Sequence, residues 1–324
     1  MRDLKSTIAL IDQLFEETDH NANPQQLYDP IDYTMHLGGK RIRPTLLVIA
    51  NEMFGGEFEN VKNAAIGIEM FHNFTLLHDD LMDNSPIRRG QPSVYSKWNA
   101  NTAILSGDTM YALAWKYFLK QDHPQMQRIL QCFNQTSIEV CEGQQYDMNF
   151  ENNDHVSIAE YMEMIRLKTA VLIAGALKIG GIYANAPDTD IERLYNFGIH
   201  LGLAFQLQDD LLDATSDTVT LGKKTNNDIC DNKKTFLVIK AFEHSSAEQR
   251  QTIHKLYQTK PEDPSEKIKT IIDIYKQLEI YKYTEDAIEN EFRKATELLD
   301  AIQLPTTKKS PLYDILQTIK LREK

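Results

Sequence analysis

Three aspartates within five residues, Asp79, Asp80 and Asp83, end a long apolar segment that runs from Val61 to Asp83. Asp79 and Asp83 are four residues apart, so a helix places their side chains on one face. Carboxylates this close repel one another unless a cation lies between them. Mg²⁺ takes oxygen ligands, typically one or two carboxylates with phosphate oxygens and water. The cluster predicts a divalent cation at a helix end, and a solvated acidic helix end is the alternative.

The same spacing occurs a second time. Asp209, Asp210 and Asp213 end another apolar, helix-like run, Ile199 to Leu212. Two aspartate-rich helix ends in one domain can face each other across a cleft and share a metal cluster. We therefore expect both motifs to act on one substrate.

Basic residues accompany the aspartates in two places. Gly38 and Gly39 precede Lys40, Arg41 and Arg43 at the start of a predicted helix. Glycine lets a backbone approach a ligand closely, and a helix N-terminus favours an anion. An ordinary basic turn is the alternative, but beside two acidic motifs the segment predicts a metal-free diphosphate pocket.

A second basic pair follows the first aspartate motif. Pro86 stops that helix, and Arg88 and Arg89 come directly after it. Guanidinium groups bind phosphate oxygens with two parallel hydrogen bonds. This arrangement predicts a diphosphate held between metal and guanidinium.

The rest of the chain shows helical periodicity with no alternating strand pattern. No low-complexity linker or composition shift marks a domain boundary, so we expect one all-α domain over residues 1–324, with about a dozen helices. A polar loop is expected at 214–232, with further helices from Lys233 onward. The earlier helices are expected at 4–17, 27–37, 45–54, 61–83, 102–120, 126–148, 157–179 and 187–213.

Composition excludes several classes of protein. A hydrophobic content of 42% supports a sizeable core, and a formal charge of −12 argues against nonspecific nucleic-acid binding. No run approaches the roughly 18 apolar residues of a membrane span, and the N-terminus is charged and amphipathic, unlike a signal peptide. Cys132, Cys141 and Cys230 fit no metal-binding spacing. We therefore expect a soluble protein of the reducing cytoplasm.

Taken together, the motifs resemble those of the trans-isoprenyl diphosphate synthase family, in the family's order and over most of the chain. The resemblance is carried by Gly39 to Pro44, Asp79 to Asp83 with Arg88-Arg89-Gly90, Lys168-Thr169, and Gln206 to Asp213. It implies a short-chain prenyltransferase that condenses isopentenyl diphosphate head-to-tail with an allylic diphosphate. It also implies a single orthogonal helical bundle of the isoprenoid synthase type around a central cleft. Three Mg²⁺ ions, with Mn²⁺ as a substitute, and a homodimer are expected as well.

The resemblance assigns roles to individual residues. Two Mg²⁺ ions on the allylic diphosphate would be bound by Asp79, Asp80 and Asp83, and the third by Asp209 with Asp213 nearby. The same diphosphate would be contacted by Arg88, Lys168 and Lys224, and Lys233 would lie near the leaving group. Isopentenyl diphosphate would be bound by Lys40, Arg43, His72 and Arg89, and the carbocation would be flanked by Thr169 and Gln206.

One of these assignments has two solutions. The segment Gly222 to Asp228 aligns with the family's pattern through either Lys223 or Lys224. Asn226 and Asn227 also stand where many members have glycine. We assign the contact to Lys224.

The predicted reaction fits this chemistry. Ionising an allylic diphosphate separates charge, so metals and fixed cations that stabilise the leaving group supply much of the catalysis. The diphosphate itself is the expected base for the final proton loss. His72 is expected to bind substrate, and His78, beside the aspartates, to pack or to support a metal ligand.

Two rival functions remain. A class I terpene cyclase shares an aspartate-rich helical site, but it needs no isopentenyl pocket and its second metal motif usually mixes Asn, Ser and Glu. A non-catalytic subunit of a heteromeric prenyl synthase should have lost one aspartate motif. This chain keeps both motifs and the basic segment at Lys40.

The length of the product depends on the side chains below the first aspartate motif. Thr75 lies four residues before Asp79, so it is directly beneath it on the helix, and Phe74 flanks it. Phe71 lies about one turn of 5.4 Å deeper. In the resembling family, an aromatic residue at the position of Thr75 stops growth early, and the motif here lacks the insertion of many bacterial farnesyl synthases. Geranylgeranyl diphosphate is favoured, with farnesyl diphosphate next.

We predict that Phe74→Ala lengthens the products, because a smaller side chain lets the hydrocarbon extend further down the helix. Chromatographic sizing of the dephosphorylated products measures this. An unchanged product profile would show that Phe74 is not the floor of the pocket.

Overall fold

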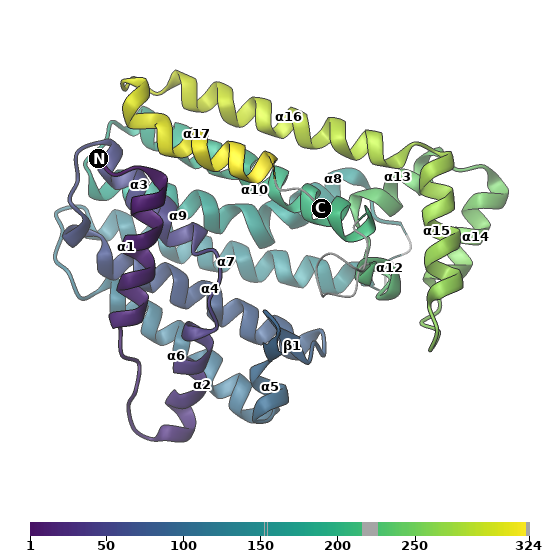
Figure 1. The fold of residues 1–324 in the computed structure, drawn as a ribbon, viewed down its shortest axis with the longest axis horizontal. Coiled ribbons are helices and arrows are strands. Elements are labelled where there is room, and N and C mark those ends of the chain that lie inside the picture. The colour runs from purple at the N-terminus through teal and green to yellow at the C-terminus, as the bar shows by residue number, and fades with distance from the viewer. Residues whose placement is uncertain (152, 154, 216–225, 322–324) are drawn as a thin grey trace. The chain divides into compact units, whose positions relative to one another are not determined.

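In the computed structural model, residues 1–151, 153, 155–215 and 226–321 are described, and they form an almost entirely helical protein (Figure 1). The prediction of an all-α fold is confirmed. Within these ranges, strand is confined to a hairpin of β1 (Ile87–Arg88) and β2 (Gln91–Pro92). None of the helices in these ranges is both long enough and apolar enough to cross a membrane.

The chain divides into two compact units. Unit 1 comprises Met1–Asn134, Gly175–Tyr195 and Gln303–Asp314, and unit 2 comprises Gln135–Ala174, Asn196–Ile302 and Ile315–Lys324. Three helices carry residues of both units: α7 (Met126–Glu151), α9 (Val171–Tyr183) and α10 (Asp188–Thr215). A fourth, α17 (Thr306–Lys320), does so as well.

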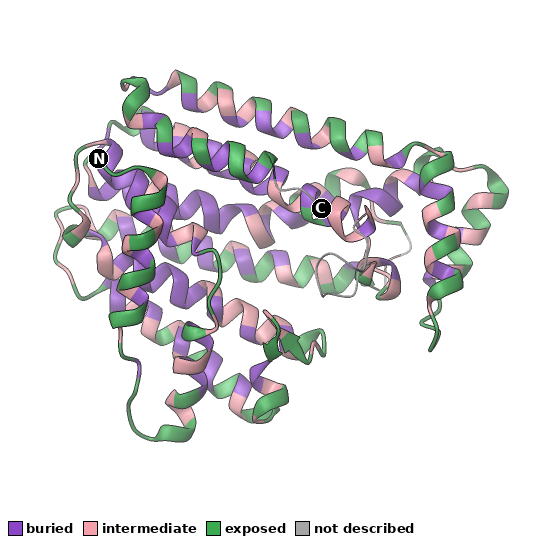
Figure 2. Cartoon of the chain, viewed as in Figure 1, coloured by how far each residue is buried: buried purple, intermediate pink, exposed green. Residues whose placement is uncertain are grey.

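Unit 1 is organised around two buried helices. The remaining elements of this unit are α1 (Leu4–Glu17), α2 (Gln25–His36), α3 (Ile42–Met53), η1 (Phe58–Asn60), α4 (Lys62–Met82), α5 (Val94–Lys97) and α6 (Ala100–Phe118). Every residue of α3 from Pro44 to Met53 is buried, and Figure 2 shows this helix almost entirely in the buried colour. The helix α4 packs against both α3 and α6. Its last turn, which carries the first aspartate motif, is therefore fixed by its neighbours.

Unit 2 contains α8 (Ile158–Ile165), a π-helical turn η2 (Arg166–Ala170), α12 (Asn227–Cys230), α13 (Phe236–His244), α14 (Ala247–Tyr257), α15 (Ser265–Gln277) and α16 (Ile280–Ala301). The helix α13 packs against α8 and α16, and α15 packs against α12 and α14. The buried ammonium group of Lys267 on α15 donates to the carbonyl of Thr259 at 3.0 Å and to the side chain of Asn232. Lys267 thus fixes the segment that follows α12.

Several helices begin where their sequences supply a cap. Asp3 accepts a hydrogen bond from the N–H of Ser6 at the start of α1, at 2.7 Å. Ser157 and Ser246 form capping boxes with Glu160 and Gln249 at the starts of α8 and α14. Each cap satisfies backbone donors that a helix leaves unpaired.

The structure differs from the predicted helices in several places: α5 was not predicted, α9 continues past 179 to Tyr183, and two further differences lie near the predicted site residues. The single helix expected over 157–179 is interrupted by η2, where the N–H of Val171 bonds to the carbonyl of Arg166. The loop expected over 214–232 contains α12. Periodicity identifies neither feature, because a π turn adds one residue without changing composition and α12 is one turn long.

A buried ion pair joins the start of α3 to α4. Arg41 is the N-cap of α3 in a left-handed conformation, φ 46°, and its guanidinium donates to Glu69 at 2.9 Å and to the carbonyl of Met35. The side chains of Arg41 and Glu69 are only 5% and 2% exposed. Of the three cations predicted at this helix start, Arg41 therefore faces the core and not a ligand.

We predict that Arg41→Met lowers the free energy of unfolding by about 3–5 kcal/mol, because it leaves the Glu69 carboxylate buried without its cation. Urea unfolding followed by circular dichroism measures this. Arg293→Met, which removes an exposed pair with Glu297, is the control and should cost about 0–1 kcal/mol. Equal losses in the two variants would contradict the prediction, and adding Glu69→Leu to Arg41→Met should restore much of the loss.

Candidate active site

The first aspartate motif ends α4. Asp79 and Asp80 lie in its last turn and Asp83 is its C-cap. Asp79 is half-buried and Asp83 is exposed, whereas Asp80 is buried and accepts hydrogen bonds from Arg88 Nε at 2.9 Å and Nη2 at 2.5 Å. Burial raises the pKa of the Asp80 carboxyl, and the bonds from Arg88 oppose that rise. Asp80 therefore holds Arg88.

A tight hairpin turn directs the side chains of the consecutive residues Arg88 and Arg89 toward different partners. Arg88 of β1 pairs with Gln91 of β2, and the two residues between them, Arg89 and Gly90, have φ of 53° and 76°. Positive φ at both positions is the geometry of a two-residue hairpin turn. Arg88 reaches the carboxylate of Asp80. Its neighbour in the turn, Arg89, instead donates to the carbonyl of Gly38.

Gly39 gives Arg89 its place. The φ of Gly39 is 124°, a value that residues with a side chain rarely adopt. A Cβ on Gly39 would lie 2.6 Å from the Cζ of Arg89. The two basic segments that the sequence places fifty residues apart are thus in contact. The predicted metal-free diphosphate pocket gains Arg89 through this contact.

His72 and Arg43 lie beside this contact. Arg43 Nη1 and His72 Nε2 are 3.0 Å apart. Burial lowers the pKa of His72 far below its ordinary value, and Arg43 and Arg89 lower it further. Burial also lowers the pKa of Arg43, to about 10. At neutral pH a charged Arg43 therefore donates to a neutral His72, and with the exposed Lys40 the group can bind an anion.

Aromatic side chains lie one turn before the aspartates. Phe74 contacts the rings of Phe71 and Tyr111, each at 5.5 Å between centroids, and Phe71 also contacts Phe133 at 5.5 Å. Phe71 is fully buried and Phe74 is half-buried. Tyr111, from α6, was not identified from the sequence, because only the packing of α6 on α4 brings it there.

Thr75 and His78 have local partners. The hydroxyl of Thr75 donates to the carbonyl of His72 at 2.8 Å. His78 Nε2 lies 3.2 Å from the carbonyl of Ile104, and its ring contacts Phe74 at 4.9 Å. His78 packs against α6, in agreement with the packing role expected for it.

The second aspartate motif lies on α10, in unit 2. Asp209 is exposed. Asp210 is buried and accepts hydrogen bonds from the hydroxyl of Tyr161 and from Gln206 at 2.9 Å. Burial raises the pKa of Asp210 to about 7. Asp213 accepts from the backbone N–H groups of Asn227 and Asp228 at 3.2 and 3.1 Å, and so caps α12.

The other predicted residues of unit 2 are brought together. Thr169 donates to Gln206 at 3.0 Å. Lys168 and Lys233 both reach the carboxylate of Asp147, on α7, at 2.6 and 3.5 Å. Asp147 was not identified from the sequence, which gives no sign that α7 faces both lysines. Lys224 and its alternative Lys223 lie outside the described residues.

The acidic residues fit a hard divalent cation. In the part of the chain that the structure describes, no three His, Cys, Asp or Glu side chains converge on a common metal position. Asp79 is nevertheless half-buried, and Asp83 and Asp209 are exposed. Mg²⁺ commonly takes one or two carboxylates and completes its shell with phosphate and water. The aspartates of each unit would hold such a cation together with a diphosphate substrate.

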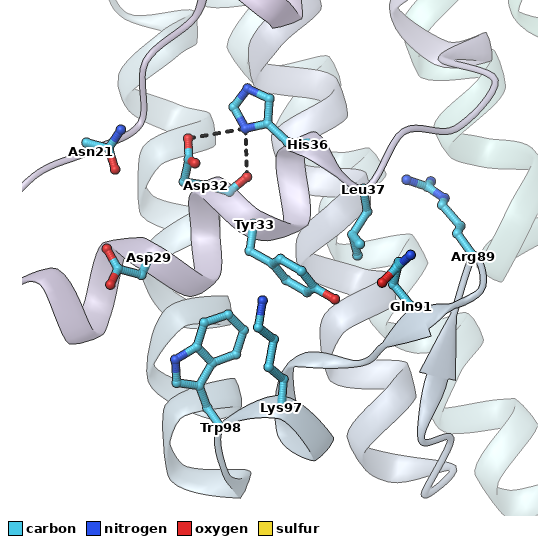
Figure 3. A pocket seen from close by; sticks show the side chains of 10 residues that line it. All are labelled: Asn21, Asp29, Asp32, Tyr33, His36, Leu37, Arg89, Gln91, Lys97 and Trp98. Carbon is cyan, nitrogen blue, oxygen red and sulfur yellow. Dashed lines mark hydrogen bonds and ion pairs between the residues drawn. The ribbon is translucent and has the colours of Figure 1, made fainter.

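A pocket of about 670 Å³ lies next to Arg89, between α2, α5 and the hairpin (Figure 3). Its walls carry charges of both signs, with Asp29 and Asp32 opposite Lys97. The ammonium of Lys97 lies 3.7 Å from the ring centre of Tyr33. A diphosphate is not expected to bind where the walls carry carboxylates as well as cations. Of the predicted site residues in unit 1, Arg89 is the one that lines this pocket.

Comparison with known proteins agrees with these features. The family model of polyprenyl synthetases matches residues 24–275. The chain belongs to this family. The predicted family and the prediction of a prenyltransferase are thus confirmed. Members of the family generally depend on Mg²⁺.

Individual relatives are similar over most of their length. The chain is 41% identical to a geranylgeranyl diphosphate synthase of Methanosarcina mazei, over 74% of this chain and 75% of that protein. It is 39% identical to a geranylfarnesyl diphosphate synthase of Natronomonas pharaonis, over 67% and 69%. A crystal structure of a geranylgeranyl pyrophosphate synthase superimposes with a TM-score of 0.94, 39% identity and 100% coverage of both chains.

We predict that Gly39→Ala raises the KM for isopentenyl diphosphate at least about tenfold, because the new Cβ displaces the Arg89 guanidinium and a charged contact is lost. The KM for the allylic substrate should stay within about twofold. Steady-state kinetics with each substrate varied in turn measures both values.

Gly55→Ala is the matched control. Gly55 also has a positive φ, 89°, but a Cβ there would meet no atom within 4 Å. It therefore carries the backbone strain without the displacement of Arg89. If both variants change the KM for isopentenyl diphosphate equally, strain and not Arg89 is responsible.

Proposed function

We propose that this chain is a Mg²⁺-dependent synthase that condenses isopentenyl diphosphate with allylic diphosphates to give geranylgeranyl diphosphate. The observation that carries the proposal is the small Thr75 beneath Asp79, with Phe74 beside it and Phe71 about one turn deeper. Phe74 contacts both Phe71 and Tyr111. In the proposed geometry the hydrocarbon passes the small Thr75 and is stopped by the aromatic side chains. Several relatives, including the one from Methanosarcina mazei, carry the name of this activity.

Two other product lengths follow from the same residues. Phe74 adjoins Thr75 and is only half-buried. If its ring stops the hydrocarbon nearer to Asp79, the product is farnesyl diphosphate, which is the next alternative. The relative from Natronomonas pharaonis is named as a geranylfarnesyl synthase. The number of carbons in the product must therefore be measured directly.

In the proposed mechanism, the residues of unit 1 bind isopentenyl diphosphate and prepare the allylic diphosphate for ionisation. Lys40, Arg43 and Arg89 bind the diphosphate of isopentenyl diphosphate, and a neutral His72 accepts from Arg43 and so orients its guanidinium. Arg88, held by Asp80, faces the allylic diphosphate. Asp79, Asp80 and Asp83 of unit 1 would hold two Mg²⁺ ions, and Asp209 of unit 2, with Asp213 nearby, would hold a third. Such ions would supply positive charge to a diphosphate leaving group.

The residues of unit 2 act on the leaving group and the carbocation. Lys168, Lys233 and Lys224 contribute positive charge to the departing diphosphate, where charge develops in the transition state. Thr169 and Gln206, which are hydrogen-bonded to each other, present oxygen atoms to the cation. No protein base is required, because the released diphosphate takes the final proton.

The proposal includes a homodimer. On α6, the apolar side chains of Ile104, Leu105 and Leu119 are 47%, 58% and 61% exposed. A second copy of the chain that covered α6 would remove them from water, which favours association. A cytoplasmic location is also part of the proposal.

The paired basic segments weigh against the rival functions. A terpene cyclase has no use for a second diphosphate pocket, yet Arg89 is seated against Gly39 beside Arg43 and His72. A silent subunit has no need for two intact aspartate motifs. The observations therefore favour the synthase over both.

We predict Mg²⁺-dependent formation of a twenty-carbon alcohol when the protein is incubated with labelled isopentenyl diphosphate and, in turn, dimethylallyl, geranyl or farnesyl diphosphate. Dephosphorylation and chromatographic sizing measure the product. EDTA should abolish turnover, and added Mg²⁺ should restore it. A fifteen- or twenty-five-carbon product would keep the enzyme class and correct the pocket depth, whereas cyclic hydrocarbons or no turnover would refute the synthase.

A further inference from the structure

The π-helical turn η2 is held by close backbone approaches from two neighbouring helices. A Cβ on Gly143 of α7 would lie 2.2 Å from the backbone N of Lys168. A Cβ on Gly202 of α10 would lie 2.5 Å from the Cα of Ala170. Real Cβ atoms do not come this close, so only glycine at these two positions lets both helices contact η2 directly.

Each glycine is followed four residues later by a side chain that bonds to η2. After Gly143 comes Asp147, whose carboxylate accepts from Lys168 at 2.6 Å. After Gly202 comes Gln206, which accepts from Thr169 at 3.0 Å. Residues four apart lie on the same face of a helix. Each glycine therefore brings its helix close enough for the side chain four residues later, Asp147 or Gln206, to reach η2.

Asp147 differs from Gln206 because it serves two cations. The same oxygen, Oδ2, lies 2.6 Å from the Nζ of Lys168 and 3.5 Å from the Nζ of Lys233. The two ammonium groups can therefore be no further apart than these two distances combined. The Asp147 side chain is 14% exposed, and those of the lysines are 24% and 22% exposed, so water screens the group only in part.

The two lysines stabilise the charged form of the Asp147 carboxylate. Burial acts to raise the pKa of Asp147, but Lys168 and Lys233 outweigh it and the pKa is lowered. Lys233 also pairs with Glu151 at 3.3 Å, but that carboxylate is 49% exposed and is therefore more strongly screened by water. Without Asp147, the two partly buried ammonium groups would repel each other, and one would lose its proton more easily. Each ammonium has three donors and can therefore bond to a carboxylate and to a diphosphate oxygen at the same time.

We propose that Asp147 is a positioning residue, which holds the ammonium groups of Lys168 and Lys233 side by side and charged before the allylic diphosphate binds. The inference rests on the proposed roles of these two lysines in binding that diphosphate. Because Asp147 positions the two ammonium groups in advance, they need not move when the diphosphate leaves. Charges that are already in place stabilise a transition state best.

The test compares Asp147→Asn, Asp147→Glu and the control Glu142→Gln, which removes an exposed carboxylate from the same helix. Asp147→Asn should lower kcat/KM for the allylic diphosphate between about tenfold and a hundredfold, because the lysines lose their fixed positions. The KM for isopentenyl diphosphate should stay within about twofold. Asp147→Glu should recover part of the loss, and Glu142→Gln should match the wild type.

The pH dependence of kcat/KM gives a readout that a merely structural role would not change. In Asp147→Asn the lysine pair loses its proton at lower pH, so activity should begin to fall on the alkaline side at a lower pH than in the wild type. An unshifted alkaline limb, or equal losses for both substrates, would overturn the proposal. Thermal unfolding identifies any variant that fails to fold, and Asp147→Glu then carries the test.

Lys168→Ala separates this inference from the assignment on which it rests. If Lys168→Ala leaves the kinetics of the allylic substrate unchanged, the proposed role of the lysine is wrong. If Lys168→Ala is impaired and Asp147→Asn is not, the lysine assignment holds and the positioning role of Asp147 is wrong.

Discussion

Repulsion between like charges at close range is the constraint on which both units depend. In unit 1, Arg43 and Arg89 lie near enough to His72 to lower its pKa, and each has a neutral or anionic neighbour. In unit 2, burial and neighbouring carboxylates raise the pKa of Asp228, and the same carboxylates act on Asp210 and Asp213. Such groups are costly to hold together without counter-charges, and the charged ligands proposed for both units would supply them.

Three cations of the two units lie on irregular backbone. Arg41 is left-handed, Arg89 is in a turn with positive φ, and Lys168 lies on a π turn. Residues in uncommon conformations persist only when their surroundings fix them. Here the surroundings are buried helices such as α3 and α4, and the regular helices thus supply the rigid frame for the irregular segments.

The sequence was sufficient to predict the fold class and most helices. The end of α1 at Glu17 and the start of α7 at Met126 agree with the predicted ones, because apolar periodicity and helix breakers are local signals. The motifs were equally local, so the family could be named from them. The roles assigned to individual residues stay predictions.

Features that depend on packing could not be predicted. Asp147 and Tyr111 reach the site only because one helix lies against another. Arg41 belongs to the same basic motif as Lys40 and Arg43, and nothing in the order of residues distinguishes the one that turns inward to Glu69. The hairpin at Arg88 was missed because two residues per strand are too few for an alternating pattern.

The π turn has a consequence for how this segment can vary in length. A π turn corresponds to an α-helix with one extra residue, and losing that residue would restore regular α-helix. All residues on one side of the deletion would then rotate by about 100° about the helix axis, since an α-helix has 3.6 residues per turn. Lys168 and Thr169 would no longer face Asp147 and Gln206 together. The helix through η2 must therefore keep its length if these side chains are to stay paired.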